Sequence, residues 1–298
     1  MARALNTHLV TNLVAANRRG MIAMVGAVAC FTTTDVLMKS ATQTLPVSQV
    51  LATRGLIAVS IILTLLSVNG GMRHFRALAQ KRVLQRTLFE TCMILSYVTA
   101  LSMAPFANVF SVLQAAPIII TAIAAFRGES VGPSRWAAVF AGFAGVALIV
   151  RPSLDGVDIA MGLALLAAFL VAARDLTTRT IPASVPSPMV TLATTLGSTG
   201  AGLALAPFEH WRAPDVATWG FLLGAAVTVA LGNYAIIQAY RQAEASVVSP
   251  LRYIGVPVAI FFGFIVWGHV PDALALVGIA LIVGSGLYTM RRETFCKP

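Results

Sequence analysis

The chain alternates between ten long apolar stretches and short polar connections. A helix needs about 20 predominantly apolar residues to cross a bilayer, and each stretch comes close to that length. The predicted spans cover residues 21–39, 48–69, 87–104, 106–126, 134–151, 159–179, 188–206, 216–238, 245–267 and 272–290. The longest polar connection runs only from Asn69 to Arg86, which leaves no room for a domain outside the membrane. The pattern predicts an all-α integral membrane protein with ten transmembrane helices.

Charged residues recur at a fixed offset of 140 positions. Asp35 and Lys39 lie in the first predicted span, and Asp175 and Arg179 occupy the same places in the sixth. Three further pairs keep this offset, namely Pro46 with Pro186, Pro117 with Pro257, and Gly128 with Gly268. The repetition predicts two similar halves with five spans each.

The two halves define the domain organisation. We expect an N-terminal tail over residues 1–20, a first five-helix repeat over 21–152, a second over 159–290 and a C-terminal tail over 291–298. Because five is odd, two similar halves must insert upside down relative to each other. The sequence therefore predicts two inverted repeats, an arrangement that suits alternating access to a site between them.

Composition and charge agree with a membrane protein. Of the 298 residues, 58% are hydrophobic and only 11% are charged, whereas soluble domains carry about 25% charged residues. The net charge of +10 comes mainly from basic residues in short loops, which argues against nucleic-acid binding. Most of these loops share a side with the N-terminus, so we expect both termini to be cytoplasmic in a bacterial inner membrane. The oligomeric state stays open.

Charges inside the spans are the first candidates for a substrate site, because a charge in a bilayer is expensive and rarely lacks a function. Asp35 and Lys39 are four residues apart, as are Asp175 and Arg179, so each pair shares one helical face. Each pair either lines or gates a substrate pathway, or forms a structural ion pair that neutralises itself. The bases lie near span ends, where they can also snorkel.

Arg54 lies inside the second predicted span. An unpaired arginine there is unfavourable, so we expect it to face Asp35, Glu90 or a cavity. Substrate binding and structural pairing both stay open for Arg54. Glu90 follows Arg86 by four residues, which predicts a helical ion pair near the cytoplasmic interface, with proton coupling as the alternative role of Glu90.

The ninth span holds the strongest single candidate for substrate binding. Arg252 and Tyr253 lie between Pro250 and Pro257, and prolines free backbone carbonyl groups. Irregular backbone at membrane depth is tolerated where it lines a cavity. Pairing of Arg252 with Glu244 is the alternative.

Uncharged polar residues inside the spans are weaker candidates. Gln114, Asn108 and Asn233 either bind substrate or join helices, and hydrogen bonding between helices is the commoner role. Tyr234 and Tyr97, like Tyr253, either stack on a flat ring or anchor the protein at the membrane interface.

Other functional classes find less support. The phosphate-binding motif Gly-x-x-x-x-Gly-Lys-Ser/Thr does not occur, so energy would come from an ion gradient, exchange or the substrate gradient. The histidines lie in tails or loops and the cysteines lack metal-ligand spacing, so we expect neither metal nor cofactor. An intramembrane transferase, which needs converging acids and bases, and a channel are the alternatives to a transporter of a small organic molecule.

Several ordered features resemble a known family. The stretch 117–129, which contains Gly128-Glu129, and the following stretch 136–152 resemble the end of an EamA repeat. Arg54 matches the recurrent arginine of that family, and the second half repeats the pattern with one departure, Gly268-His269. The resemblance to the drug/metabolite transporter superfamily covers essentially the whole chain, and implies a ten-helix inner-membrane carrier with a central cavity.

Two subgroups suggest substrates. Segments 35–39, 175–179 and 250–253 are similar to the rickettsial S-adenosylmethionine carriers, and the bacterial riboflavin importers are similar overall. Riboflavin would favour tyrosines and amides, whereas S-adenosylmethionine would use Asp35 or Asp175 with Arg252. We favour riboflavin uptake, with transport of S-adenosylmethionine, amino acids or drugs as the alternatives.

Overall fold

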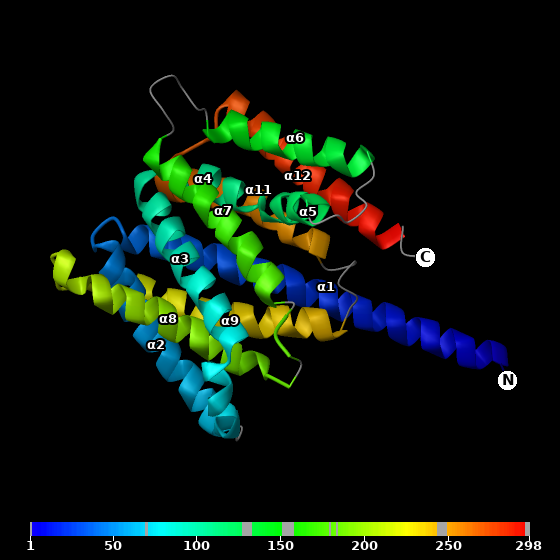
Figure 1. Cartoon of the computed structure of the whole chain (residues 1–298), viewed down its shortest axis with the longest axis horizontal. Coiled ribbons are helices and arrows are strands. Elements are labelled where there is room, and N and C mark those ends of the chain that lie inside the picture. Colours follow the sequence, from blue (N-terminus) through cyan, green and yellow to red (C-terminus); the bar gives the residue numbers. More distant parts are fainter. Residues whose placement is uncertain are drawn as a thin grey trace.

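The computed structural model describes residues 2–68, 71–126, 133–150, 158–178, 180–182, 184–242 and 249–295. Every regular element in these residues is an α-helix (α) or a short 3-10 helix (η), and Figure 1 labels the α-helices. The first half contains α1 (Ala2–Ala41), α2 (Val47–Val68), η1 (Gly71–Ala79), α3 (Lys81–Met103), α4 (Phe106–Leu113), α5 (Ala116–Phe126) and α6 (Pro133–Val150). The second half contains α7 (Ile159–Thr178), α8 (Ser187–Leu205), η2 (Ala206–Phe208), α9 (Val216–Gln242), η3 (Ser249–Ile254), α11 (Gly255–Trp267) and α12 (Ala273–Phe295).

The apolar pattern accounts for these helices. Within the described residues, each predicted span coincides with one helix or with two consecutive helices. In the described part of the chain, five helical segments are long and apolar enough to cross a membrane, namely Arg18–Ala41, Val47–Val68, Ile159–Thr178, Ser187–Phe208 and Val216–Ala235. Four further apolar helices are shorter, and α3 falls in neither group because it carries Lys81, Arg82, Arg86 and Glu90.

The fourth and ninth predicted spans are not continuous α-helices. In the first half, α4 ends at Leu113 and α5 begins at Ala116. Pro117 explains this break, since it has no N–H to donate to the carbonyl of Leu113 and its ring clashes with that carbonyl. In the second half, η3 changes to α11 at Gly255, just before Pro257. The prediction of one helix over 106–126 is therefore wrong at this point, and the two breaks occupy equivalent positions of the halves.

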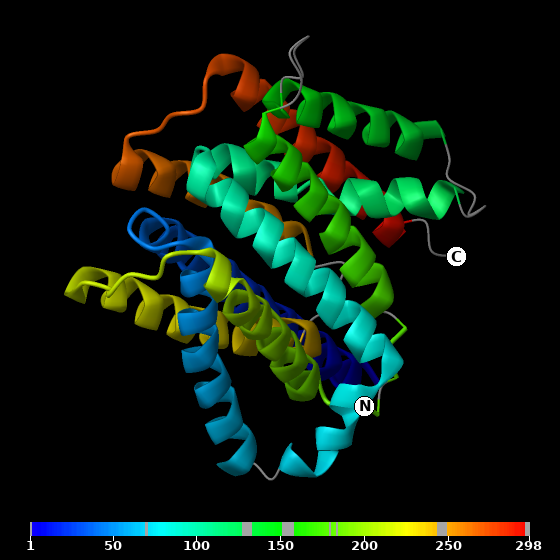
Figure 2. The same ribbon diagram turned by 60° about the vertical axis from the view of Figure 1, so that its left-hand side comes forward.

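Helices of the first half pack mainly against helices of the second (Figures 1 and 2). The most extensive contacts join α1 with α9, α3 with α7, α2 with α8, and α6 with α12. At the offset of 140 residues, the counterparts of α1 and α9 are α7 and α3. Exchange of the halves therefore converts the contact of α1 with α9 into the contact of α7 with α3, and it leaves the other two contacts unchanged. The contact pattern thus has a twofold relation between the halves.

Glycines allow the closest of these contacts. A Cβ atom on Gly145 of α6 would lie 2.6 Å from the carbonyl oxygen of Gly278 of α12, and the reverse distance is also 2.6 Å. A Cβ atom on Gly202 of α8 would lie 2.7 Å from the carbonyl oxygen of Ser48 of α2. Small residues at such crossings are typical of helix packing in membranes.

Acidic side chains cap four helices, α2, α7, α9 and α12, at their first turns. The acids are Glu209, Asp158, Asp215 and Asp272, which accept the backbone N–H groups of Ser48 (3.1 Å), Ala160 (2.7 Å), Thr218 (2.9 Å) and Ala275 (2.9 Å). Hydrogen bonds from Thr218 lower the pKa of the Asp215 carboxyl group. Each carboxylate satisfies an N–H group that has no intrahelical partner and interacts favourably with the helix dipole.

Candidate functional site

Lys39 shows how the ends of α1 and α3 align. Its side chain is 4% exposed, and Nζ donates to the carbonyl oxygens of Leu101 and Ala104 (2.6 Å for Ala104) at the end of α3. The carbonyl of Leu101 cannot pair within the helix, because Pro105 has no N–H. The ammonium group also lies 5.3 Å from the ring centroid of Trp267. Lys39 therefore joins helices at this end of the bundle.

Asp35, Arg54 and Tyr97 form what we call the polar layer. At 1.5 Å per residue, Asp35 lies about 9 Å before the end of α1, Arg54 about 10 Å after the start of α2, and Tyr97 about 9 Å before the end of α3. The Tyr97 hydroxyl donates to Oδ2 of Asp35 at 3.1 Å. Although both residues are described, Asp35 and Lys39 form no ion pair, so the structure lacks the internal pair that was the alternative to a lining or gating role.

Arg54 is the most unusual member of the polar layer. It is 7% exposed, and its Nε atom is enclosed without a hydrogen-bond partner in the described part of the chain. No described residue accepts a hydrogen bond from its two terminal nitrogens, and these, unlike Nε, are not fully enclosed. Asp35 and Glu90 lie within electrostatic reach of the guanidinium, but neither is at ion-pair distance. A buried cation without a direct partner is unfavourable, which makes Arg54 a strong functional candidate.

Glu90, Arg174 and Asp175 form a second group, which we call the ionic layer. Arg174 donates from Nη1 to Oε2 of Glu90 and from Nε to Oδ1 of Asp175, both at 2.9 Å, and the first bond joins α3 to α7. The predicted pair of Glu90 with Arg86 is therefore wrong, because Glu90 pairs with Arg174 on another helix. Nε of Arg86 donates to the hydroxyl of Thr178 instead (2.9 Å). Sequence reasoning missed Arg174, although a charge inside the sixth span was a usable signal.

The two helix breaks meet inside the bundle. Nε2 of Gln114 donates to the carbonyl oxygen of Arg252 at 3.5 Å. The Arg252 side chain is partly exposed, and among the described residues its guanidinium has no hydrogen-bond or ion-pair partner. Glu244, its alternative partner, lies outside the described residues. Tyr253 is buried against Gly286 of α12, and no described residue is a hydrogen-bond partner of its hydroxyl.

The remaining predicted site residues do not join the polar layer. Nδ2 of Asn233 donates to the carbonyl of Val229 in its own helix at 2.9 Å. Tyr234 is 65% exposed, so it faces the surroundings of the protein. Arg179 lies outside the described residues, and the described partner of Asp175 is its neighbour Arg174.

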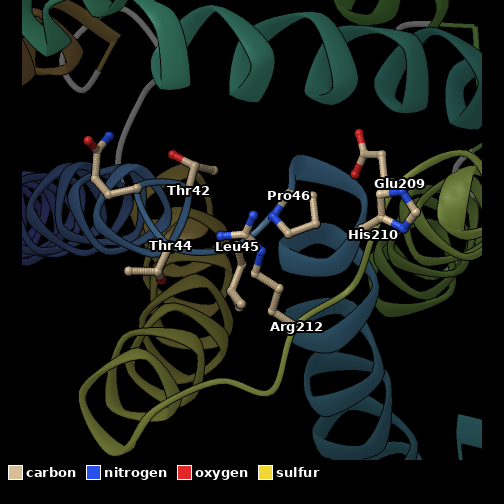
Figure 3. A pocket seen from close by; sticks show the side chains of 8 residues that line it. Thr42, Thr44, Leu45, Pro46, Glu209, His210 and Arg212 are labelled. Atoms are coloured by element: carbon tan, nitrogen blue, oxygen red, sulfur yellow. The ribbon is translucent and has the colours of Figure 1, made fainter.

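A cavity of about 410 Å³ lies at the turn between α1 and α2 (Figure 3). It is lined by Thr42, Gln43, Thr44, Leu45, Pro46, Glu209, His210 and Arg212. The loop between α8 and α9 forms one wall, and Gln49 holds it by two hydrogen bonds with the backbone of Arg212 (2.6 and 3.0 Å). The polar layer lies roughly two helical turns deeper along α1 and α2.

A second cavity, of about 450 Å³, is lined by residues at the start of α4 and the end of α11, including Asn108 and His269. Among the described residues, no group of three or more His, Cys, Asp or Glu side chains could hold a metal ion.

Known proteins resemble the chain over most of its length. The model of the EamA-like transporter family matches residues 18–151 and 158–291. A riboflavin transporter of Rhizobium johnstonii is 31% identical over 229 residues, 75% of this chain and 74% of that protein. A pseudopaline exporter of Pseudomonas aeruginosa is 25% identical over 271 residues, 89% of this chain and 94% of that protein.

The fold also has a counterpart among solved structures. The match to one crystal structure covers 93% of this chain and 99% of the chain in that structure, with a TM-score of 0.61 and 19% sequence identity. At that identity the likeness concerns the fold alone. Together with the apolar helices, the matches show a multi-pass helical membrane protein.

Proposed function

Because the chain belongs to the EamA-like transporter family, we propose that it is a secondary carrier that takes up riboflavin across the bacterial inner membrane. The observation that carries the proposed site is the Arg54 guanidinium, which is nine-tenths buried and has no hydrogen-bond partner among the described residues. In a transporter, a substrate is the partner best suited to satisfy such a group.

We assign ten transmembrane helices to two inverted repeats, over residues 21–152 and 159–290. Three observations support this assignment. The main helix contacts are unchanged when the halves are exchanged. The helix breaks before Pro117 and Pro257 are equivalent. The two family matches also begin 140 residues apart, at residues 18 and 158.

We also assign both termini to the cytoplasm. The basic residues support this orientation, since most of them fall in loops on the side of the N-terminus. The four acid-capped helix starts then all lie on the outer side. The cavity beside the turn between α1 and α2 opens on that side as well, so it would lead substrate toward the polar layer.

Alternating access would separate two equivalent interfaces in turn. The contact of α3 with α7 is held by the ion pair of Arg174 with Glu90. Its counterpart, the contact of α1 with α9, is held by a 2.7 Å hydrogen bond between the hydroxyls of Thr34 and Thr228. Thr34 is the residue equivalent to Arg174. Release of the first contact would expose the polar layer to the cytoplasm, and release of the second would expose it to the outside.

Riboflavin is supported by sequence and by chemistry. The Rhizobium relative named for riboflavin is more similar in sequence than the pseudopaline exporter, 31% against 25%. The polar layer contains one acid and one base, so its charges balance and suit an uncharged ligand. Riboflavin is such a molecule, with a broad ring and many hydrogen-bonding groups.

Growth of a riboflavin auxotroph that lacks its own importer tests the proposal. We expect the chain to restore growth on low external riboflavin, an Arg54→Ala variant to fail, and an Arg82→Ala variant to succeed, since Arg82 is exposed on α3. Membrane expression of all three is measured in parallel. Absence of rescue by the expressed parent chain would contradict riboflavin uptake and favour S-adenosylmethionine uptake or export.

A further inference from the structure

The polar layer contains an acceptor, the carboxylate of Asp35, and a donor, the guanidinium of Arg54, that do not bond to each other. Within the described part of the chain, Asp35 receives one hydrogen bond, from Tyr97 to Oδ2, and its Oδ1 is neither paired nor fully enclosed. Arg54 has two terminal nitrogens in the same condition. The site thus presents a free acceptor on α1 and free donors on α2.

Asp35 and Arg54 attract each other but do not touch. Each lies within electrostatic reach of the other, yet their separation exceeds the 4.0 Å of an ion pair. Opposite charges in a low-dielectric interior gain strongly from contact. Tyr97 holds Asp35 on the side of α3, and a ligand that bonds to both Asp35 and Arg54 would satisfy the two groups at once.

The chemistry of Asp35 and Arg54 defines the edge of a ligand that would bond to both. The ligand must offer an acceptor to Arg54 and, beside it, an N–H or O–H donor to Asp35, because a buried polar group without a partner is unfavourable. The two protein charges already balance, so this edge needs no net charge. A cyclic imide has this pattern, with an N–H between two carbonyl groups. In riboflavin the imide is the N3–H group between the C2 and C4 carbonyls.

We infer that Asp35 and Arg54 read the imide edge of the flavin ring, with Asp35 accepting from N3–H and Arg54 donating to an adjacent carbonyl oxygen. This inference rests on the proposed function, because it specifies how the same site recognises riboflavin. Tyr97 is then a positioning residue that fixes the carboxylate of Asp35. The ribityl chain and the dimethylbenzene edge lie away from this contact.

Binding of flavin analogues to the purified, full-length protein tests the inference, with each dissociation constant measured by equilibrium dialysis and flavin absorbance. The probes are riboflavin, N3-methylriboflavin, which lacks the imide donor, and an 8-dimethylamino analogue, which has added bulk at the opposite edge and an intact imide. We expect the parent chain to bind riboflavin at least about 10-fold more tightly than N3-methylriboflavin, the effect of one hydrogen bond to a charged group. We expect the 8-dimethylamino analogue to bind within a few-fold of riboflavin.

The Asp35→Leu variant separates hydrogen bonding from steric fit, since leucine keeps the branched shape but removes the acceptor. We expect this variant to bind riboflavin about 10-fold more weakly and N3-methylriboflavin unchanged, so that the preference disappears. The matched control is Asp215→Ala, an exposed capping acid outside the layer, which should keep the preference. A preference that persists in Asp35→Leu would mean steric exclusion and overturn the inference.

The failures of the two proposals are distinguishable. Equal binding of riboflavin and N3-methylriboflavin by the parent chain would overturn the imide contact and leave riboflavin transport standing. No binding or uptake of riboflavin by a well-folded parent chain would overturn both. If Asp35→Leu proves unstable, Tyr97→Phe provides a second variant, since loss of the hydroxyl should reduce the preference without removing the carboxylate.

Discussion

Replacement of Lys39 by methionine distinguishes a helix-joining role from a substrate-binding role. The ammonium group bonds to two carbonyl groups at the end of α3 and lies over the ring of Trp267. Methionine has a similar volume and cannot donate a hydrogen bond. The Lys39→Met variant therefore removes these interactions with little change in packing.

The expected loss of stability follows from these contacts. A hydrogen bond to a charged group contributes about 1.5–3 kcal/mol, and the cation–π contact adds about 0.5–2 kcal/mol. The variant also removes the cost of burying a charged ammonium group, which offsets several kcal/mol of this sum. We expect a net destabilisation of about 2 kcal/mol, which corresponds to a decrease in Tm of roughly 4–8 °C.

Thermal unfolding of the detergent-solubilised protein, followed by intrinsic fluorescence, measures this effect. Lys81→Met is the matched control, because Lys81 is exposed at the opposite end of α3. The Tm of this control variant should stay within about 1 °C of the parent Tm. Folded Lys39→Met protein should keep the substrate affinity of the parent. An unchanged Tm together with a large loss of affinity would refute the structural role and restore Lys39 as a binding residue.

Three further predictions concern packing, the ionic layer and the loop beside the cavity. The Gly286→Ala variant places a methyl group where the hydroxyl of Tyr253 lies, and should lower stability by about 1–3 kcal/mol, measured by thermal unfolding, with partial recovery on adding Tyr253→Leu. Glu90→Gln removes the carboxylate that pairs with Arg174, and should make a cysteine probe between α3 and α7 react at least about 5-fold faster; an unchanged rate would exclude a closing role for that pair. Gln49→Ala removes both hydrogen bonds to the loop between α8 and α9. It should increase the rate at which a protease added outside right-side-out membrane vesicles cleaves that loop.

The sequence carries enough information to locate the helices but not their internal breaks. Apolar length alone places helical segments, because backbone groups in a bilayer must pair within the segment. The interruption after Leu113 was not predicted, although Pro117 signals it through the missing N–H four residues later. The same rule, applied to the ninth span, indicates the change from η3 to α11 before Pro257.

The polar interior was predicted only in part, because a sequence spacing does not determine which helices are neighbours. The i, i+4 spacing suggested that Asp35 pairs with Lys39, yet Lys39 bonds to the end of α3 and Asp35 bonds to Tyr97. Glu90 likewise bonds to Arg174 of α7 rather than to a residue of its own helix. Arg54 was expected near Asp35 or Glu90, and both lie within its electrostatic reach. Partners across helices depend on tertiary packing, which local periodicity cannot specify.

Uptake of radiolabelled riboflavin by proteoliposomes that contain only this purified chain tests the central claim most directly. We expect saturable uptake that is accelerated by unlabelled riboflavin inside the vesicles, since a carrier with bound substrate changes from its inward-open to its outward-open state faster than an empty one. Arg54→Ala should lower the apparent affinity by about 10-fold to 100-fold, while Arg82→Ala should behave like the parent. Uptake that does not saturate, is not accelerated by internal riboflavin, or is equal in the parent and Arg54→Ala would contradict a riboflavin carrier with its site at Arg54.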